Sequence, residues 1–143
     1  MGLDQKFVIV KDKRLFLYKE GEAVLYYDEQ DNMNYPDSVA DLFLRKVNCV
    51  QGYFEMKYDL QNCDYIRVSV EDIQYLLEES SYILDTKDFE LAKERLPIQY
   101  GLFYGNYEYD ENYLVDLEIC KATMQQILET IESDDAILYW SWW

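Results

Sequence analysis

The sequence contains no histidine, and this absence removes several kinds of chemistry at once. The commonest zinc ligand sets and the commonest general base of enzymes both need histidine, as do the usual nucleophilic triads. The three cysteines are widely spaced, odd in number and without a CxxC pair, so they indicate reduced, mostly buried residues. No GxSxG, HExxH, P-loop or GxGxxG motif occurs. We therefore expect a non-catalytic protein without cofactor or metal.

Long apolar segments and basic residues are also scarce. No apolar run approaches the roughly 18 residues that span a membrane, and the first residues lack the apolar stretch of a secretory signal. Half of the 143 residues are nevertheless hydrophobic, which predicts a folded chain. Because no linker, repeat or shift of composition divides it, we expect a single acidic domain over residues 1–143, located in the cytoplasm.

Acidic residues dominate the charge. The chain has 13 basic and 29 acidic residues, a net charge of −16. Residues 1–19 carry 5 − 2 = +3, so the remainder carries −16 − 3 = −19. A surface of this charge repels nucleic acid and anionic membranes and accelerates association with a basic partner. The alternative interpretation is that the charge only maintains solubility.

Two segments combine tyrosines with acidic residues, and we interpret them as candidate partner-binding surfaces. Tyrosine offers rigid, partly apolar contact area, and carboxylates pair with Lys or Arg of a partner. The alternative is that these tyrosines are half-buried strand residues beside a solvated acidic rim. The first cluster comprises Tyr26, Tyr27, Asp28, Glu29 and Asp31, and the second comprises Tyr107, Glu108, Tyr109, Asp110, Glu111 and Tyr113.

Two further groups of residues are weak candidates for ion-binding sites. Asp28–Asn34 is rich in carboxylates and amides, but it lacks the central glycine and the Glu at position twelve of a calcium-binding EF-hand loop. Lys11, Lys13 and Arg14 lie together at a predicted turn, where they form the one candidate for an anion site in this region. We expect neither ion to be bound.

Periodicity and turn residues predict seven or eight strands and four helices. Because the two kinds of element do not alternate regularly, we predict an α+β fold with a mainly antiparallel sheet. In this prediction Ile98–Tyr104 and Tyr113–Cys120 form a central hairpin, and the aromatic tail forms a strand through which two copies could pair. The other predicted strands are Lys6–Val10, Leu15–Lys19, Ala23–Tyr27, Tyr53–Tyr58 and Tyr65–Val70. The predicted helices run from Pro36 to about Val50 with a stop at Gly52, from a capping box at Ser69 and Asp72, over Lys87–Arg95, and from Thr123 onward.

In size, charge and missing catalytic motifs, the whole chain resembles the small immunity proteins that bacteria encode beside contact-dependent growth inhibition or polymorphic toxins. The resemblance implies a protein, monomer or homodimer, that binds and neutralises a cognate basic toxin domain, frequently a nuclease. It includes no family motif, so it assigns no role to any residue. The same charge also fits a nucleic-acid mimic that inhibits a DNA-binding defence enzyme, such as a restriction or CRISPR effector. A hydrolase with paired carboxylates and a plain structural domain are further alternatives.

Overall fold

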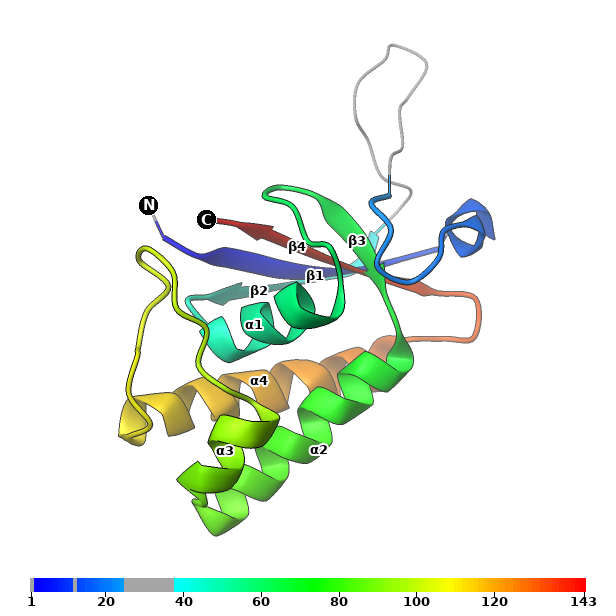
Figure 1. Ribbon diagram of the computed structural model, residues 1–143. Coiled ribbons are helices and arrows are strands. Elements are labelled where there is room, and N and C mark those ends of the chain that lie inside the picture. The colour runs from blue at the N-terminus through cyan, green and yellow to red at the C-terminus, as the bar shows by residue number, and fades with distance from the viewer. Residues whose placement is uncertain (1, 12, 25–37) are drawn as a thin grey trace.

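The computed structural model describes residues 2–11, 13–24 and 38–143, in which four helices cover one face of an antiparallel sheet (Figure 1). The four strands lie in the order β2-β1-β4-β3. The strands are β1 (Asp4–Val10), β2 (Ser38–Arg45), β3 (Tyr65–Val68) and β4 (Ala136–Trp142). The helices are α1 (Asn48–Lys57), α2 (Val70–Thr86), α3 (Phe89–Arg95) and α4 (Glu111–Thr130), with a 3-10 helix, η1, over Lys13–Leu17. The predicted α+β class with an antiparallel sheet is confirmed.

The main hydrophobic core lies between the sheet and the helices. Phe7 of β1, Phe54 of α1 and Tyr139 of β4 are fully buried, and their ring centroids lie 4.5–5.9 Å apart. Burial of aromatic rings at such distances supplies much of the apolar contact of a core. A smaller cluster, which includes Val8, Leu15 and Leu138, covers part of the opposite face of the sheet. Both faces of the central strands are thus packed over part of their length.

Several predicted elements are confirmed. Lys6–Val10 lies in β1, and β3 begins at Tyr65 as predicted. The capping box is present, because Ser69 Oγ accepts a hydrogen bond from the Asp72 N–H and Asp72 Oδ2 accepts one from the Ser69 N–H, each at 3.0 Å. The predicted helix over Lys87–Arg95 begins two residues later, at Phe89, with Asp88 as its N-cap.

For two other predicted segments, the secondary structure was wrong. The predicted helix from Pro36 onward is strand β2 followed by the start of α1, and the predicted strand Tyr53–Tyr58 is the end of α1 and its C-cap. Gly52 lies inside α1 rather than ending it. A Cβ atom on Gly52 would come within 2.8 Å of the Gln99 Cβ, so glycine here permits a close approach of two segments.

The predicted central hairpin does not exist. Ile98–Tyr104 is irregular, and Tyr113–Cys120 belongs to α4. Thr123 lies within that helix, where its hydroxyl donates to the carbonyl oxygen of Ile119 at 2.8 Å, so it is not the predicted cap. The predicted strand Leu15–Lys19 is largely η1.

Of the predicted strand Ala23–Tyr27, only Ala23 and Val24 are described; Ala23 forms a single bridge with Ile66. The predicted strand at the C-terminal end of the sequence is confirmed as β4, and its position bears on the alternative that two copies pair through it. β4 is a central strand that pairs with β1 on one side and β3 on the other, so its backbone offers no open edge.

Candidate functional site

Residues 96–110 connect α3 to α4 without any helix or strand, and we call this connection the 96–110 loop. Structureless connections of about 12–15 residues are uncommon in compact domains, and ordered ones are usually functional. This loop is therefore a candidate binding site.

Hydrogen bonds fix the loop against α1 and against Leu3, the residue before β1. The side chain of Asn48, the buried first residue of α1, donates to the carbonyl oxygen of Asn106 at 2.7 Å and accepts from the Gln99 N–H at 3.2 Å. The Leu3 N–H donates to the Phe103 carbonyl oxygen at 3.4 Å. Because these contacts come from residues far away in the sequence, the loop depends on the tertiary fold for its shape.

The loop backbone adopts conformations that are rare in proteins. Gly105 has a φ of +107°, and a Cβ atom there would lie 2.9 Å from the Cβ of Lys46. Phe103 has a φ of +59°, which is unusual for a bulky residue. Strained residues of this kind cluster at ligand contacts and persist only where surrounding contacts impose them. In this loop, Phe103 combines a positive φ with an exposed side chain.

The tip of the loop exposes large apolar side chains. The exposed fraction is 67% for Tyr100, 79% for Leu102, 53% for Phe103 and 39% for Tyr107. The rings of Tyr100 and Tyr107 lie 5.3 Å apart, and the Tyr107 hydroxyl donates to the Gly101 carbonyl oxygen. With Lys46, these residues border an open hollow of about 620 Å³. A contiguous exposed patch of large apolar residues marks an interaction site in soluble proteins.

The second predicted cluster borders this patch, although its members differ in role. Tyr107, Glu108 and Glu111 are exposed, as a binding surface requires. Asp110 is the N-cap of α4, since its Oδ1 atom accepts from the Asn112 N–H at 2.9 Å. Half-buried Tyr109 accepts a hydrogen bond from the Ile98 N–H at 3.0 Å.

The assignment of Tyr113 to a binding surface is wrong. Only 1% of this residue is exposed, and its hydroxyl donates to the Leu96 carbonyl oxygen at 2.8 Å. The first predicted cluster, Tyr26 to Asp31, lies outside the described residues, as does most of the acidic segment Asp28–Asn34. Sequence reasoning missed Tyr100, Leu102 and Phe103; the signal that could have found them is the density of large apolar residues between the Pro97 and Gly105 turn residues.

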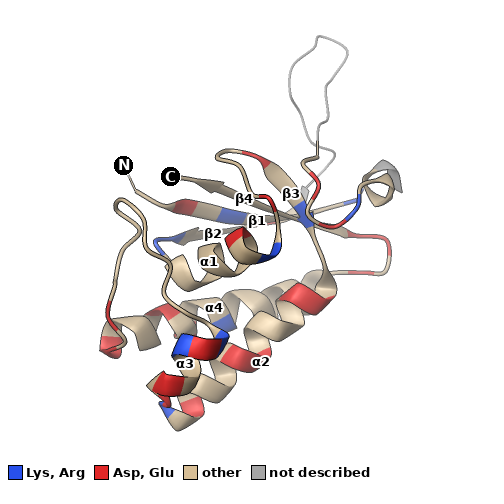
Figure 2. Cartoon of the chain, in the orientation of Figure 1, with Lys and Arg blue, Asp and Glu red and all other residues tan. Residues whose placement is uncertain are grey.

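The acidic charge is concentrated in residues 70–135, which comprise α2, α3, α4, the 96–110 loop and the connection that follows α4. These residues include 17 acidic and 4 basic ones, so they carry 4 − 17 = −13 of the total of −16. Figure 2 shows acidic residues along α2, α3 and α4. On α2, Glu71, Glu78 and Asp85 are exposed and seven residues apart, which places them in one row along the helix.

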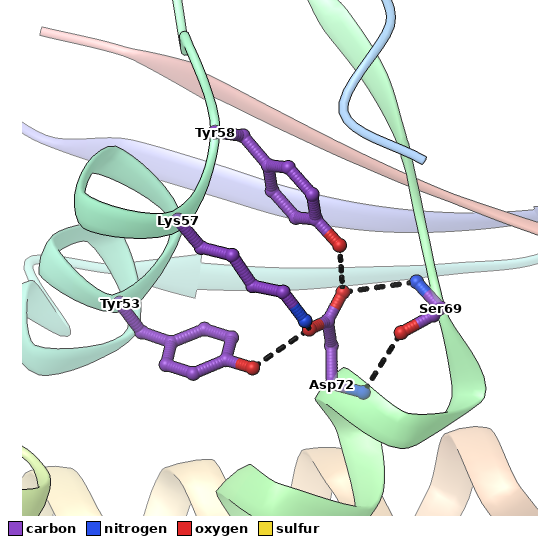
Figure 3. A network of polar contacts seen from close by, with 5 residues as sticks. All are labelled: Tyr53, Lys57, Tyr58, Ser69 and Asp72. Carbon is purple, nitrogen blue, oxygen red and sulfur yellow. Dashed lines mark hydrogen bonds and ion pairs between the residues drawn. The ribbon is translucent and has the colours of Figure 1, made fainter. Parts of the chain in front are cut away.

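A buried carboxylate, Asp72, is the centre of a network of hydrogen bonds (Figure 3). Asp72 has no exposed surface, and it accepts hydrogen bonds from Tyr53 at 2.7 Å, Tyr58 at 2.5 Å and the Ser69 N–H, together with an ion pair from Lys57. Burial alone raises the pKa of Asp72, but the bonds from Lys57, Tyr58, Ser69 and Tyr53 outweigh it and hold the pKa below its usual value. These donors join the end of α1 to the start of α2, so we assign the group a structural role.

A second carboxylate has the opposite shift. Burial, followed by the negative charge of Asp110, raises the pKa of Asp116 to about 6. Neither residue lines the hollow at the 96–110 loop, so this pair is not part of the candidate site. Among the described residues, no group of three or more His, Cys, Asp or Glu side chains is arranged to hold a metal ion.

None of the described helices combines the length and the apolar character needed to cross a membrane. No family model, curated protein or solved structure matches this chain. The 96–110 loop and the acidic helices that adjoin it are the candidate functional features of the described residues.

Proposed function

We propose that this chain is a non-catalytic immunity protein that neutralises a cognate basic toxin domain by binding it with the 96–110 loop. The observation that carries the proposal is the loop itself, which is fixed at its base, exposes four large apolar side chains and lies within residues 70–135, a range that carries a charge of −13. A central group of aromatic anchors with a charged rim is the usual anatomy of a specific protein interface.

The two parts of this surface have different tasks. Tyr100, Phe103 and Tyr107 supply anchors that bury apolar area, and because the loop is already ordered, little entropy is lost on binding. Glu108 and Glu111 at the border, with the other acidic residues of the range 70–135, attract a basic partner and accelerate its association. Binding of this kind covers the partner's active site or substrate groove without any chemical step.

The test is affinity capture from the native lysate at low and high salt, with variants of the loop. The double substitution Tyr100→Ala and Phe103→Ala removes two exposed anchors, and Tyr82→Ala on α2 removes a tyrosine of similar exposure, 55% against 67% for Tyr100, as the matched control. We expect one basic protein to be recovered with the native chain and the control, and the double variant to weaken binding at least tenfold, since hot-spot residues contribute about 2 kcal/mol or more each. High salt should slow association.

Two results would contradict the proposal. Equal recovery with the loop variant and the Tyr82 control would show that the loop is not the interface. A partner whose expression in the absence of this chain leaves growth unaffected would show that the chain is not an immunity protein.

A nucleic-acid mimic is the second candidate, and the row of Glu71, Glu78 and Asp85 on α2 favours it. Seven helical residues rise about 10.5 Å, so these carboxylates form a regular line along an extended face, as the phosphates of a nucleic acid do. Substitution of all three by their amides should then abolish capture of a DNA-binding enzyme, while the loop variant retains it. The opposite pattern supports the immunity proposal.

A further inference from the structure

The two edge strands of the sheet differ in whether another segment is hydrogen-bonded to their outer side. The outer edge of β3 is covered by residues 21–24, since the Val24 N–H donates to the Tyr65 carbonyl oxygen at 2.7 Å and Gly21 and Glu22 bond to the backbone of Arg67 at 2.6 and 3.1 Å. The other edge is β2, and on its outer side no strand of the described chain pairs with it. An edge strand of eight residues that has no neighbouring strand among the described residues can serve as a template for pairing with another strand.

The register of the β1–β2 ladder shows which backbone groups point outward. The Lys46 N–H donates to the Leu3 carbonyl oxygen at 2.8 Å, one step beyond the pair Asp4 and Arg45. Because bonded and non-bonded pairs alternate in an antiparallel ladder, the backbone groups of Leu44 and Leu42 face β1. Those of Phe43 and Arg45 consequently face away from the sheet.

The outer strand has a sequence that is complementary to itself. The segment Asp41-Leu42-Phe43-Leu44-Arg45 reads acid, leucine, phenylalanine, leucine, base. When two copies run antiparallel about Phe43, each Asp41 lies opposite an Arg45, each Leu42 lies opposite a Leu44, and Phe43 lies opposite its own copy. Within its own chain Arg45 lies 3.5 Å from Asp4, and both side chains are partly exposed, so a facing Asp41 would join an existing ion pair. Opposite charges and aromatic pairs at directly facing positions both stabilise antiparallel strands.

The burial of these side chains agrees with that pairing. Leu42 and Leu44 face the helices and are 7% and 6% exposed, whereas Phe43 is 73% exposed on the opposite face. Pairing would therefore extend the leucine layer of the core and cover the exposed phenylalanine. β2 also belongs to the part of the chain outside residues 70–135, which carries only −16 + 13 = −3, so repulsion between two copies is weakest there.

We propose that β2 pairs with β2 of a second copy of this chain, centred on Phe43, to form one continuous eight-stranded antiparallel sheet. The interface is isologous, because the same five residues contribute from both sides of a two-fold axis. None of the five residues of this interface lines the hollow at the 96–110 loop, and the proposal does not depend on the proposed function.

Charge exchange tests both the dimer and its register. Asp41→Arg places Arg opposite Arg45, and Arg45→Asp places Asp opposite Asp41, so in sedimentation equilibrium each variant alone should dimerise at least tenfold more weakly than the native chain. An equimolar mixture should form a heterodimer, because each Arg of one variant then faces an Asp of the other. Glu71→Arg on α2 changes the net charge as Asp41→Arg does and should leave the dimer unchanged.

A cross-link provides an independent measurement. In a Cys63→Ser background, which removes the exposed native thiol, Phe43→Cys should form an intersubunit disulfide when oxidised glutathione accepts the two electrons. The facing Cα atoms of a bonded antiparallel pair lie about 5.5 Å apart, within disulfide range. Val39→Cys is the control, since its own copy does not face it in this register.

Three outcomes would overturn the proposal. A native chain that stays monomeric at high concentration excludes the dimer. A dimer that withstands both charge variants uses a different surface. A mixture of the variants that fails to associate, with Val39→Cys cross-linked as readily as Phe43→Cys, excludes the register.

Discussion

Asp72 shows how a buried charge can stabilise this fold. Its carboxylate has no exposed surface and is bonded by Lys57, Tyr53, Tyr58 and Ser69. We expect Asp72→Asn to lower the free energy of unfolding by about 3 kcal/mol at pH 7, because the hydrogen bonds from Tyr53, Tyr58 and Lys57 lose a charged acceptor and the capping box is weakened. Tyr53→Phe, which removes one hydrogen bond, should cost about 1 kcal/mol. Urea unfolding measures both, and equal costs would show that the charge of Asp72 contributes nothing.

Asp116 should make the free energy of unfolding depend on pH, because its pKa is raised in the folded state, whereas that of Asp72 is lowered. Its folded pKa, about 6, lies above the ordinary value of 3.8, so between about pH 4 and pH 6 the folded state binds more protons than the unfolded state. Stability should therefore fall as the pH rises through this window. Asp116→Asn should remove this slope and stabilise the protein by roughly 1 kcal/mol at pH 7, after allowance for partial exposure.

Urea unfolding of the native chain and the variant at pH 4, 5, 6 and 7 gives the comparison. Asp85→Asn on α2, an exposed acid with the same change of charge, is the control. Parallel profiles for the native chain and Asp116→Asn would show that Asp116 is ionised normally.

At the scale of elements, Gly52 couples helix α1 to the 96–110 loop. Alanine favours a helix interior over glycine by about 1 kcal/mol, but its Cβ would lie 2.8 Å from the Gln99 Cβ and 3.0 Å from Gln99 Oε1. We expect Gly52→Ala to displace Gln99 and to lower the free energy of unfolding by about 1 kcal/mol despite the better helix former.

Hydrogen exchange should locate the effect of Gly52→Ala. Residues 98–106 should exchange faster, while α1 keeps its protection. Gln74→Ala, at an exposed site on α2, is the control, because it changes helix propensity without contact to the loop. Unchanged exchange in the loop would show that Gln99 does not hold it.

Elements that depend on neighbouring residues could be predicted from the sequence, whereas elements that depend on tertiary contacts could not. The capping box at Ser69 and Asp72 was predictable because both partners lie within four residues. α4 was not, because in Tyr113–Cys120 the apolar residues at every second position fit a strand, while Tyr113, Leu117 and Cys120 also fit the spacing of a helix, and only the tertiary fold decides between the two. In β2 the apolar residues also fit a helix, and only pairing with β1 decides in favour of a strand.

At the scale of the molecule, the fold class was predictable, whereas the site was predictable only in part. Tyr107, Glu108 and Glu111 follow from composition, since tyrosines and acids near turns tend to be exposed. The exposure of Phe103 does not, because it depends on a loop held by Asn48, more than fifty residues earlier.

The central position of β4 has a consequence for how the chain acquires its structure during synthesis. Ile9 of β1 pairs with Ile137 of β4, a separation of 137 − 9 = 128 residues, and β4 is also the strand with which β3 pairs. Contacts this distant in sequence close slowly. During synthesis, β1 and β3 cannot be joined until residues 136–142 have left the ribosome. Until then the nascent chain exposes strand edges and apolar side chains. Proteins that hold such chains in solution should bind this one most strongly just before its last strand emerges.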